Sequence, residues 1–531
     1  MDSQAIYRRR WLILSVLIVG LLAIVIDNTV LNVALKTIAE PHGGLGASQS
    51  QLEWAINSYT LVFAGLLFTF GVVGDKIGRK RMLMIGLALF GIASLLSAYA
   101  QTPEQLIFAR AAMGLGGAAV MPQTLSIISN VFEPAERPRA IGLWATAVGL
   151  GIATGPVLGG LLLDHFWWGS VFLINVPVTV IGAIAAAVLV PESRNHEAGG
   201  IDYVGVLLSI AGLITLVYGI VQGGDTGSWV RLDVLGPVAG GLVILGVFAW
   251  YEARIAHPSL DVRLFRDRRL SASVGALALV FFGMGGVFFF TSFYLQNVRG
   301  YSPLAAGLLT VPFAAGQLVM SPRSAALVRA YGAKAAGATG LFVMAAAVAG
   351  YAALGTTSPI WVLGVLFGIQ GAAMGVVMPA ATSAVMDVLP RERAGAGSAL
   401  TNTARQVAVA LSVAVLGSIL AEFYRNSLSP SLAGLPAATR DAASSSISAT
   451  QAVAQQLGAS GRSLLAPANT AFVGAMHVTT LVAAALALAG ALVVLRWMPG
   501  KPRKAAAAEP AHEPELAIME QEMLQTVERE V

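Results

Sequence analysis

The chain has 531 residues, of which 56% are hydrophobic and 11% are charged, and its formal net charge is +5. A soluble domain carries about a quarter of its residues as charged side chains, so this composition excludes a protein with an ordinary water-facing surface. Cysteine is absent, which excludes disulfides and thiolate metal sites. The basic residues lie in short loops between apolar runs. In such loops they indicate how the chain is oriented in a membrane, and they do not indicate nucleic-acid binding.

Apolar runs of about 20 residues, the length of a bilayer-spanning helix, recur along the whole chain. The first run follows a short basic stretch, but it is too long for a signal peptide and lacks a clean cleavage site. The pattern predicts an all-α polytopic membrane protein. Its fourteen transmembrane helices are expected at 11–37, 52–73, 81–100, 105–131, 139–163, 168–190, 203–222, 233–252, 270–297, 303–328, 334–354, 360–386, 396–423 and 474–497.

Basic residues gather in the loops on one side of these helices, together with both termini. The other side keeps only scattered basic residues such as Arg231, Arg299 and Arg425. The positive-inside rule therefore predicts that both termini are cytoplasmic. Residues 424–473 are expected to form a long Ala/Ser-rich external loop with room for a short amphipathic helix, and residues 501–531 a cytoplasmic tail that turns from basic to acidic.

An internal repeat divides the chain. The string AAMGLGGAAVMPQTLSIISNVF (111–132) matches GIQGAAMGVVMPAATSAVMDVL (368–389), and the copies lie roughly 255 residues apart. The repeat predicts two related six-helix bundles with two inserted helices between them. We expect an N-terminal bundle at 1–190, inserted helices 7 and 8 at 191–262, a C-terminal bundle at 263–500 and the tail. The matched residues are Gly78 with Gly332, Gly114 with Gly371, and Met121-Pro122 with Met378-Pro379.

The string GVVGDKIGRKR (71–81) lies in the predicted cytoplasmic loop between helices 2 and 3. Its glycines permit a tight turn, and its acidic residue can face a helix N-terminus, where an anion is favoured. It lacks the spacing of a phosphate-binding loop. The candidate residues for a conformational switch are Gly71, Asp75, Gly78, Arg79 and Lys80.

This string resembles the loop 2–3 signature of the major facilitator superfamily. Three further strings narrow the resemblance to its fourteen-helix drug:proton antiporters: IDNTVLNVAL (26–35) in helix 1, LIFARAAMGLGGA (106–118) in helix 4 and GIATGPVLGG (151–160) in helix 5. The resemblance covers the chain up to helix 14 and implies the major facilitator fold. One departure is Met113, where the family usually carries Gln, while Gln370 stands at that place in the second repeat.

Asp27 is the carboxylate that lies well inside a predicted span, and charges at such positions are costly and usually functional. At 1.5 Å per residue it lies roughly 22 Å from the inner end of helix 1, and Arg110 lies roughly 7 Å from the outer end of helix 4. Both therefore reach the outer half of the bilayer and can pair. We expect Asp27 to bind the transported proton and Arg110 to control that binding. A static ion pair that only fixes packing is the alternative.

Helix 5 carries Gly151, Gly155 and Gly159 at four-residue intervals, followed by Gly160, and Pro156 adds a bend. Small residues at this spacing let two helices approach closely in lipid. The family resemblance implies that helix 5 packs against the opposite bundle, so the motif is expected to be a hinge and seal. Ordinary small-residue packing is the alternative.

A substrate cavity is expected at the midplane between the bundles. The aromatics of helix 9, Phe289, Phe290, Phe293 and Tyr294, would suit broad apolar recognition, although such stripes are more often lipid-facing or core. Arg405 can gate the inner side, bind an anionic substrate group or simply pack. The predicted lining residues are Asn28, Asn32, Asn57, Tyr59, Gln123, Trp144, Phe293, Gln370, Asn402 and Arg405.

These features predict a monomeric proton-coupled antiporter of the inner membrane. It would export small amphipathic or cationic drugs by alternating access, with no cofactor besides the proton gradient, no metal and no nucleic acid. The missing P-loop argues against an ATP-driven pump, and the lack of a cluster of catalytic side chains argues against an enzyme. Three alternatives stay open: an exporter of one endogenous product such as an antibiotic, lipid or siderophore, a nutrient symporter, and a non-transporting sensor or scaffold.

Overall fold

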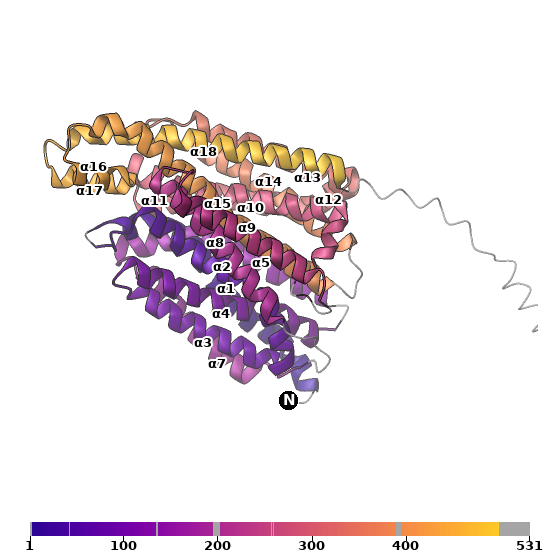
Figure 1. Cartoon of the computed structure of the whole chain (residues 1–531). Coiled ribbons are helices and arrows are strands. Elements are labelled where there is room, and N and C mark those ends of the chain that lie inside the picture. Colours follow the sequence, from indigo (N-terminus) through magenta and orange to yellow (C-terminus); the bar gives the residue numbers. More distant parts are fainter. Residues whose placement is uncertain are drawn as a thin grey trace, which may run out of the picture.

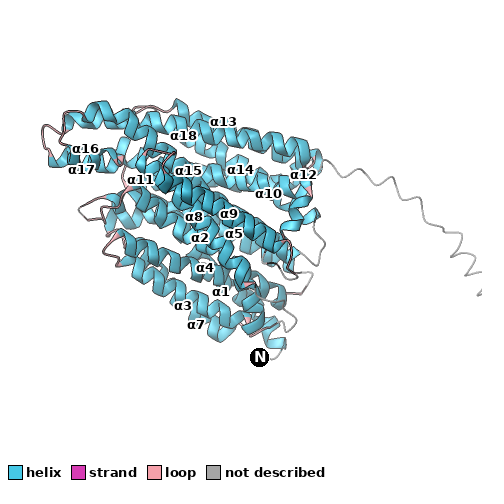
Figure 2. Cartoon of the chain, viewed as in Figure 1, coloured by secondary structure: helices cyan, strands magenta, loops and turns pink. Residues whose placement is uncertain are grey.

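The structure is a computed structural model, which describes residues 3–41, 43–133, 136–194, 202–255, 258, 260–388 and 394–498. Within these ranges the regular structure is helical (Figures 1 and 2). Among the described residues thirteen helices are long and apolar enough to cross a membrane, and α2, bent by 54°, brings the number to as many as fourteen. The fold class is therefore confirmed, and the number of candidate spans agrees with the predicted fourteen.

The first eight spans are α1 (Ser3–Ala39), α2 (Gln49–Ile77), α3 (Arg79–Ala98), α4 (Pro103–Val131), α5 (Arg137–His165), α6 with α7 (Ser170–Leu173 and Asn175–Leu189), α8 (Tyr203–Thr226) and α9 (Leu232–Glu252). The last six are α10 (Arg268–Phe293), which continues into the π-helical turn η2 (Tyr294–Val298), α11 with α12 (Pro303–Leu308 and Val311–Tyr331), α13 (Ala333–Gly350), α14 (Ile360–Val388), α15 (Ala394–Leu432) and α18 (Arg462–Trp497).

Two sets of six spans share one packing pattern. In the first set α1 packs on α5 and α7, α3 on α4 and α7, and α2 on α4. In the second set α10 packs on α15 and α18, α13 on α14 and α18, and α12 on α14. The sets form two bundles, indigo to purple and pink to yellow in Figure 1. Between the bundles α5 contacts α11 and α12, and α15 contacts α2 in the symmetry-related way.

The repeat extends to backbone conformation. Gly78 separates α2 from α3 with φ +121°, and Gly332 separates α12 from α13 with φ +88°. Residues with a Cβ rarely adopt this conformation. Each glycine therefore ends one helix and lets the next begin at once, at equivalent places in the two bundles.

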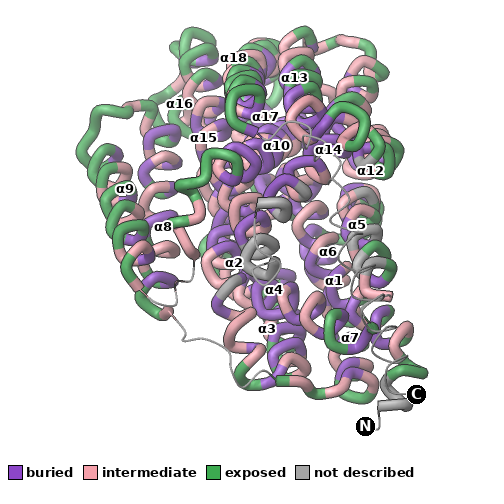
Figure 3. Tube along the Cα trace, turned by 90° about the vertical axis from the view of Figure 1, so that its right-hand side faces the viewer, coloured by how far each residue is buried: buried purple, intermediate pink, exposed green. Residues whose placement is uncertain are grey.

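The inserted helices α8 and α9 lie beside the seam between the bundles (Figures 1 and 3). α8 packs on both α2 and α15, through a cluster that includes Leu61, Val217 and Ala414. α9 packs on α8 and leaves large apolar side chains such as Leu242 and Val243 exposed. An exposed apolar surface of this kind suits contact with lipid.

The segment at 424–473, predicted as a long loop with room for a short helix, is mostly helical and connects α15 to α18 over a shorter stretch than expected. α15 continues unbroken to Leu432, α18 already begins at Arg462, and α16 (Ala437–Ser444) and α17 (Ile447–Gln456) lie between them. Hydropathy falls in this segment, but its many alanines keep a high helix propensity, so the helices extend beyond the apolar spans. We call the end of the molecule with α16 and α17 the hairpin end, and the end where α1 begins and α18 stops the terminus end (Figure 1).

Candidate functional site

A buried ion pair joins α1 and α4. Asp27 and Arg110 are each 1% exposed, and Arg110 Nη1 donates a hydrogen bond to Asp27 Oδ2. Arg110 Nε also donates to the Ala55 carbonyl oxygen in α2, at 3.0 Å. The structure thus brings together the two charged residues whose depth along their helices allowed them to pair.

The second oxygen of this carboxylate is held by a residue that the sequence analysis missed. Asn175 Nδ2, in α7, donates to Asp27 Oδ1 at 3.1 Å and to Ser94 Oγ at 3.1 Å. Both Asp27 oxygens therefore accept hydrogen bonds, as an ionised carboxylate in an apolar span requires. The signal that could have revealed Asn175 is an amide inside the otherwise apolar predicted helix at 168–190.

A short chain of contacts connects the ion pair to the space between the bundles. The guanidinium of Arg110 lies 4.4 Å from the centre of the Tyr59 ring, at cation–π distance. Asn28 Nδ2 donates to the Tyr59 hydroxyl oxygen at 3.1 Å. A molecule that displaces Asn28 or Arg110 therefore changes the surroundings of the Asp27 carboxylate.

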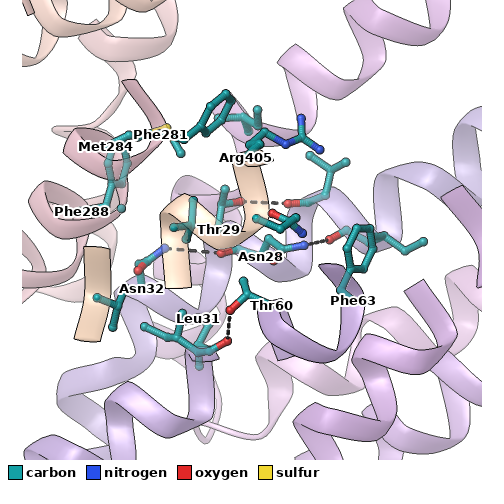
Figure 4. A pocket seen from close by; sticks show the side chains of 18 of the residues that line it. Asn28, Thr29, Leu31, Asn32, Thr60, Phe63, Phe281, Met284, Phe288 and Arg405 are labelled. Atoms are coloured by element: carbon teal, nitrogen blue, oxygen red, sulfur yellow. Dashed lines mark hydrogen bonds between the residues drawn. The ribbon is translucent and has the colours of Figure 1, made fainter. Parts of the chain in front are cut away.

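The cavity between the bundles has a volume of about 120 Å³, and its walls come from α1, α2, α4, α5, α10 and α15 (Figure 4). Sites for drug-sized molecules measure roughly 300–1,000 Å³, so the bundles have to move apart before this cavity holds one completely. Its polar lining residues are Asn28, Thr29, Asn32, Thr60, Arg110, Arg405 and Gln406.

Three of the ten predicted lining residues, Asn28, Asn32 and Arg405, line this cavity. Tyr59 lies behind Asn28, and both Asn57 and Asn402 lie outside the lining. The remaining four take part in packing within one bundle. Gln123 donates to the Phe70 carbonyl, Trp144 donates to Thr124 Oγ1, Gln370 accepts from the Tyr351 hydroxyl, and Phe293 packs edge-on against Phe289.

In α10 the aromatic stripe considered for substrate recognition takes the alternative position, in the core. Phe281, Met284 and Phe288 line the cavity at intervals of about one turn, whereas Phe289, Phe290 and Phe293 are 1% exposed and outside the lining. A long apolar run predicts a buried helix but does not indicate which aromatic side chains face the partner bundle.

Arg405, in α15, has a different environment from Arg110. Its guanidinium lies 5.4 Å from the centre of the Phe281 ring, and no hydrogen bond or ion pair to it occurs in the part of the chain that the structure describes (Figure 4). The residues that line the cavity include both arginines and no acidic side chain. Since Asp27 offsets Arg110, the charge of Arg405 leaves the cavity wall positive.

The candidate switch loop is tied to the end of α7. Asp75 accepts a hydrogen bond from Arg79 Nε at 2.7 Å, at the start of α3. Lys80 Nζ donates to the Ala187 carbonyl at 2.6 Å, and the Lys80 backbone amide donates to Glu192 at 3.2 Å. Gly71 lies against Pro122 of α4. These contacts join α2 and α3 to α4, to the end of α7 and to Glu192, which follows α7.

The glycines of α5 serve two contacts. A Cβ atom on Gly151 or Gly159 would lie 2.8 or 3.0 Å from Val25 or Val30 of α1, in the same bundle, and one on Gly155 would overlap Thr29. Pro156 and Gly160 of the motif lie against the opposite bundle. A Cβ on Gly160 would lie 2.5 Å from Leu304 Cα of α11, and one on Gly307 of α11 would overlap the Pro156 carbonyl.

Comparison with known proteins agrees with this architecture. A family profile described as "Major Facilitator Superfamily" matches residues 10–413. The chain is 35% identical over 488 residues to the "Multidrug efflux pump LfrA" of Mycolicibacterium smegmatis. This match covers 92% of this chain and 96% of that protein. It is 32% identical to the "Methyl viologen resistance protein SmvA" of Salmonella typhimurium, with 92% and 97% covered. It is 30% identical to the "Tetracenomycin C resistance and export protein" of Streptomyces glaucescens, with 94% of each covered.

Among solved structures, the chain is similar to a bacterial homologue of the human lysosomal transporter Spinster in an inward-facing, unoccupied conformation. The TM-score is 0.64, the sequence identity is 17%, and the match covers 93% of this chain and 99% of the other. At this level of identity the likeness concerns the fold.

Proposed function

This chain belongs to the major facilitator superfamily, and from that premise we propose that it exports small amphipathic or cationic drugs in exchange for protons. It is a multi-pass protein of the inner membrane with the architecture of multidrug and antibiotic efflux transporters. The observation that carries the proposal is the buried Asp27–Arg110 pair, which adjoins a cavity between two bundles. One molecule contains both bundles and the cavity, so a monomer is sufficient.

The proton acts on Asp27 in this proposal. Protonation removes the negative charge that holds Arg110 and Asn175, so the pair loosens and Arg110 is freed toward the cavity that it lines. Loss of the proton restores the pair. The position of α4 relative to α1 then depends on proton binding, and a substrate that contacts Asn28 or Arg110 competes for the same arrangement.

The orientation of the chain is part of the proposal. Basic residues such as Arg79, Lys80 and Arg139 lie at the terminus end, which supports a cytoplasmic position for that end. The hairpin end is then external. There Gln296 Nε2 of η2 donates to the Val33 carbonyl of α1 at 2.9 Å, so the two bundles are in contact on the external side.

A second candidate function is the export of one endogenous product, and Arg405 favours it. A guanidinium with no acceptor among the described residues disfavours a cationic group beside it and favours a carbonyl, phenol or carboxylate group. An antibiotic, lipid or siderophore that presents such a group next to an aromatic body would fit the wall formed by Arg405, Phe281 and Phe288.

The test is pH-driven transport of a fluorescent cationic dye into inverted membrane vesicles. Asp27→Asn keeps the shape of the side chain, and we expect at least tenfold slower transport with unchanged protein content, because the amide cannot carry the proton. The matched control is Asp233→Asn, which removes a carboxylate that α9 exposes at its first turn. This control should transport like the parent protein.

Equal transport by the parent protein and Asp27→Asn would mean that the carboxylate is structural, and proton coupling at Asp27 would be wrong. A sensor or scaffold would transport no dye in either form. Absence of transport of any cationic dye, with transport of an acceptor-bearing compound, would support the second candidate function.

A further inference from the structure

A second carboxyl group is buried where α2 of the N-terminal bundle meets α15 of the C-terminal bundle. Glu53 is 2% exposed; Gln49 Nε2 lies 3.4 Å from its Oε1, and its Oε2 has no hydrogen-bond partner among the described residues. A Cβ atom on Gly417 of α15 would overlap the Glu53 carboxyl group. The carboxyl group thus lies directly against the backbone of the opposite bundle.

No cation of the described chain offsets this carboxyl group. The charge that acts on it belongs to Asp225, at the end of α8, and is repulsive. The other charged groups that α15 and α4 carry in this region already have partners: Glu422 accepts from Trp229 Nε1, Arg425 donates to the Gly224 carbonyl, Glu104 accepts from Gln51 Nε2, and Arg110 pairs with Asp27. An ionised carboxylate buried in this way is costly, so only the protonated form of Glu53 fits the closed contact.

The same face of α2 continues toward the cavity. Asn57, one turn from Glu53, is 0% exposed, and neither its Oδ1 nor its Nδ2 has a partner in the described structure. Thr60, in the next turn, lines the central cavity. Buried polar groups without partners are rare, and two of them in succession indicate a surface that meets water in another conformation.

We propose that Glu53 is a second proton-binding site, which must take up a proton from the external medium before α2 and α15 can close. This inference rests on the proposed antiport and on the external position of the hairpin end. When the bundles separate there, the carboxylate accepts a proton from hydronium and leaves water behind. The neutral carboxyl group then packs against Gly417. A transporter that has released its substrate outside therefore cannot close its external side without taking up a proton.

The chain has no cysteine, so two spin labels can be introduced without background. Gln101 and Thr357 suit this purpose, because both are exposed and lie in the loops that precede α4 and α14 at the hairpin end. The distance between the labels is measured in lipid nanodiscs as a function of pH. An Asp27→Asn background removes the contribution of the first proton site.

In this background we expect the ratio of closed to open molecules to increase as the pH falls, by up to about tenfold per pH unit for one proton. Glu53→Gln, which imitates the protonated group, should stay closed at every pH. Glu104→Gln removes an exposed carboxylate at the same end and should titrate like the background protein. Gly417→Ala fills the space of the carboxyl group and should stay open at every pH.

The inference is overturned if Glu53→Gln titrates like the background protein, or if the background protein shows no pH dependence. Should Glu53→Gln fail to fold, a Gly417→Ala protein that closes normally at low pH would overturn it as well. Failure of dye export together with intact pH-dependent closure would count against the proposed function alone.

Discussion

The two six-helix bundles share one packing pattern but have chemically different centres. A Cβ atom on Gly114 would lie 2.6 Å from the Tyr59 carbonyl oxygen, and one on Gly371 would overlap the Phe313 carbonyl in the same way. The residue four positions before each glycine, one helical turn away, is Arg110 in the first bundle and Phe367 in the second.

These two residues have opposite surroundings. Arg110 pairs with Asp27 and covers the ring of Tyr59. Phe367 packs among aromatic rings, with centroid distances of 5.6 Å to Phe288 and 5.9 Å to Tyr351. The same helix packing therefore forms around a charged residue in one bundle and an apolar residue in the other. Since an apolar centre satisfies its packing, the charged centre of the first bundle is more than a packing device, which favours a role in transport over a static ion pair.

The largest expected loss of stability comes from replacing Arg110 with phenylalanine, the residue at the equivalent place in the second bundle. Arg110→Phe removes the partner of a buried carboxylate, and breaking a buried pair in this way costs about 3–5 kcal/mol. We expect a correspondingly lower stability in thermal unfolding of the detergent-purified protein. The control substitution Phe367→Leu, which keeps an apolar residue at the equivalent place, should cost less than about 1.5 kcal/mol.

The same experiment separates charge from shape. The double variant Asp27→Asn with Arg110→Phe no longer contains an unpaired buried charge, so it should recover a large part of the lost stability while pH-driven transport stays absent. A double variant as unstable as Arg110→Phe alone would show that the aromatic side chain does not fit the first bundle, and the comparison between the centres would then be wrong.

Most of the fold was predictable because it follows from hydropathy and from a repeat that survives in the sequence. The spans, the inserted pair and the equivalence of Gly78 and Gly332 all came from such signals. The partnership of Asp27 and Arg110 was predictable because depth along two antiparallel helices is simple arithmetic.

Rotation of helices about their axes was not predictable, since nearly every side of these helices is apolar. For this reason Asn175 was missed and Phe293 was assigned to the cavity. The burial of Glu53 was not predictable either, because it depends on Gly417, which is distant in the sequence. Residues 501–531 lie outside the described part of the chain, so the cytoplasmic tail stays a prediction.

A second test concerns the charge that the C-terminal bundle contributes to the cavity. A zwitterionic rhodamine with a free carboxylate and its cationic methyl ester share one aromatic body and differ in the acceptor group. Because a charge-assisted hydrogen bond contributes roughly 1.5–3 kcal/mol, Arg405→Gln should raise the KM for the zwitterion about tenfold or more. It should leave the KM for the ester unchanged or lower it.

The matched control for this test is Phe288→Ala, which removes apolar wall and no charge. This variant should weaken transport of both dyes alike. Equal effects of Arg405→Gln on the two dyes would mean that Arg405 only packs against Phe281, and the preference for acceptor-bearing substrates would be wrong.

The smallest expected effect concerns the one departure from the helix 4 motif. In the first bundle Met113 Sδ lies 3.3 Å from Ser97 Oγ, whose hydroxyl also donates to the Ala93 carbonyl at 2.9 Å; in the second bundle the Tyr351 hydroxyl donates to Gln370 Oε1 at 2.9 Å. Met113→Gln places an amide group beside a hydroxyl that already has a carbonyl acceptor, so it should change the stability by no more than about 1 kcal/mol. Gln370→Met leaves a buried hydroxyl with a poor acceptor and should cost about 1–3 kcal/mol in thermal unfolding. A larger loss for Met113→Gln would mean that the Arg110 centre excludes a second polar group, and the two positions would then not be equivalent.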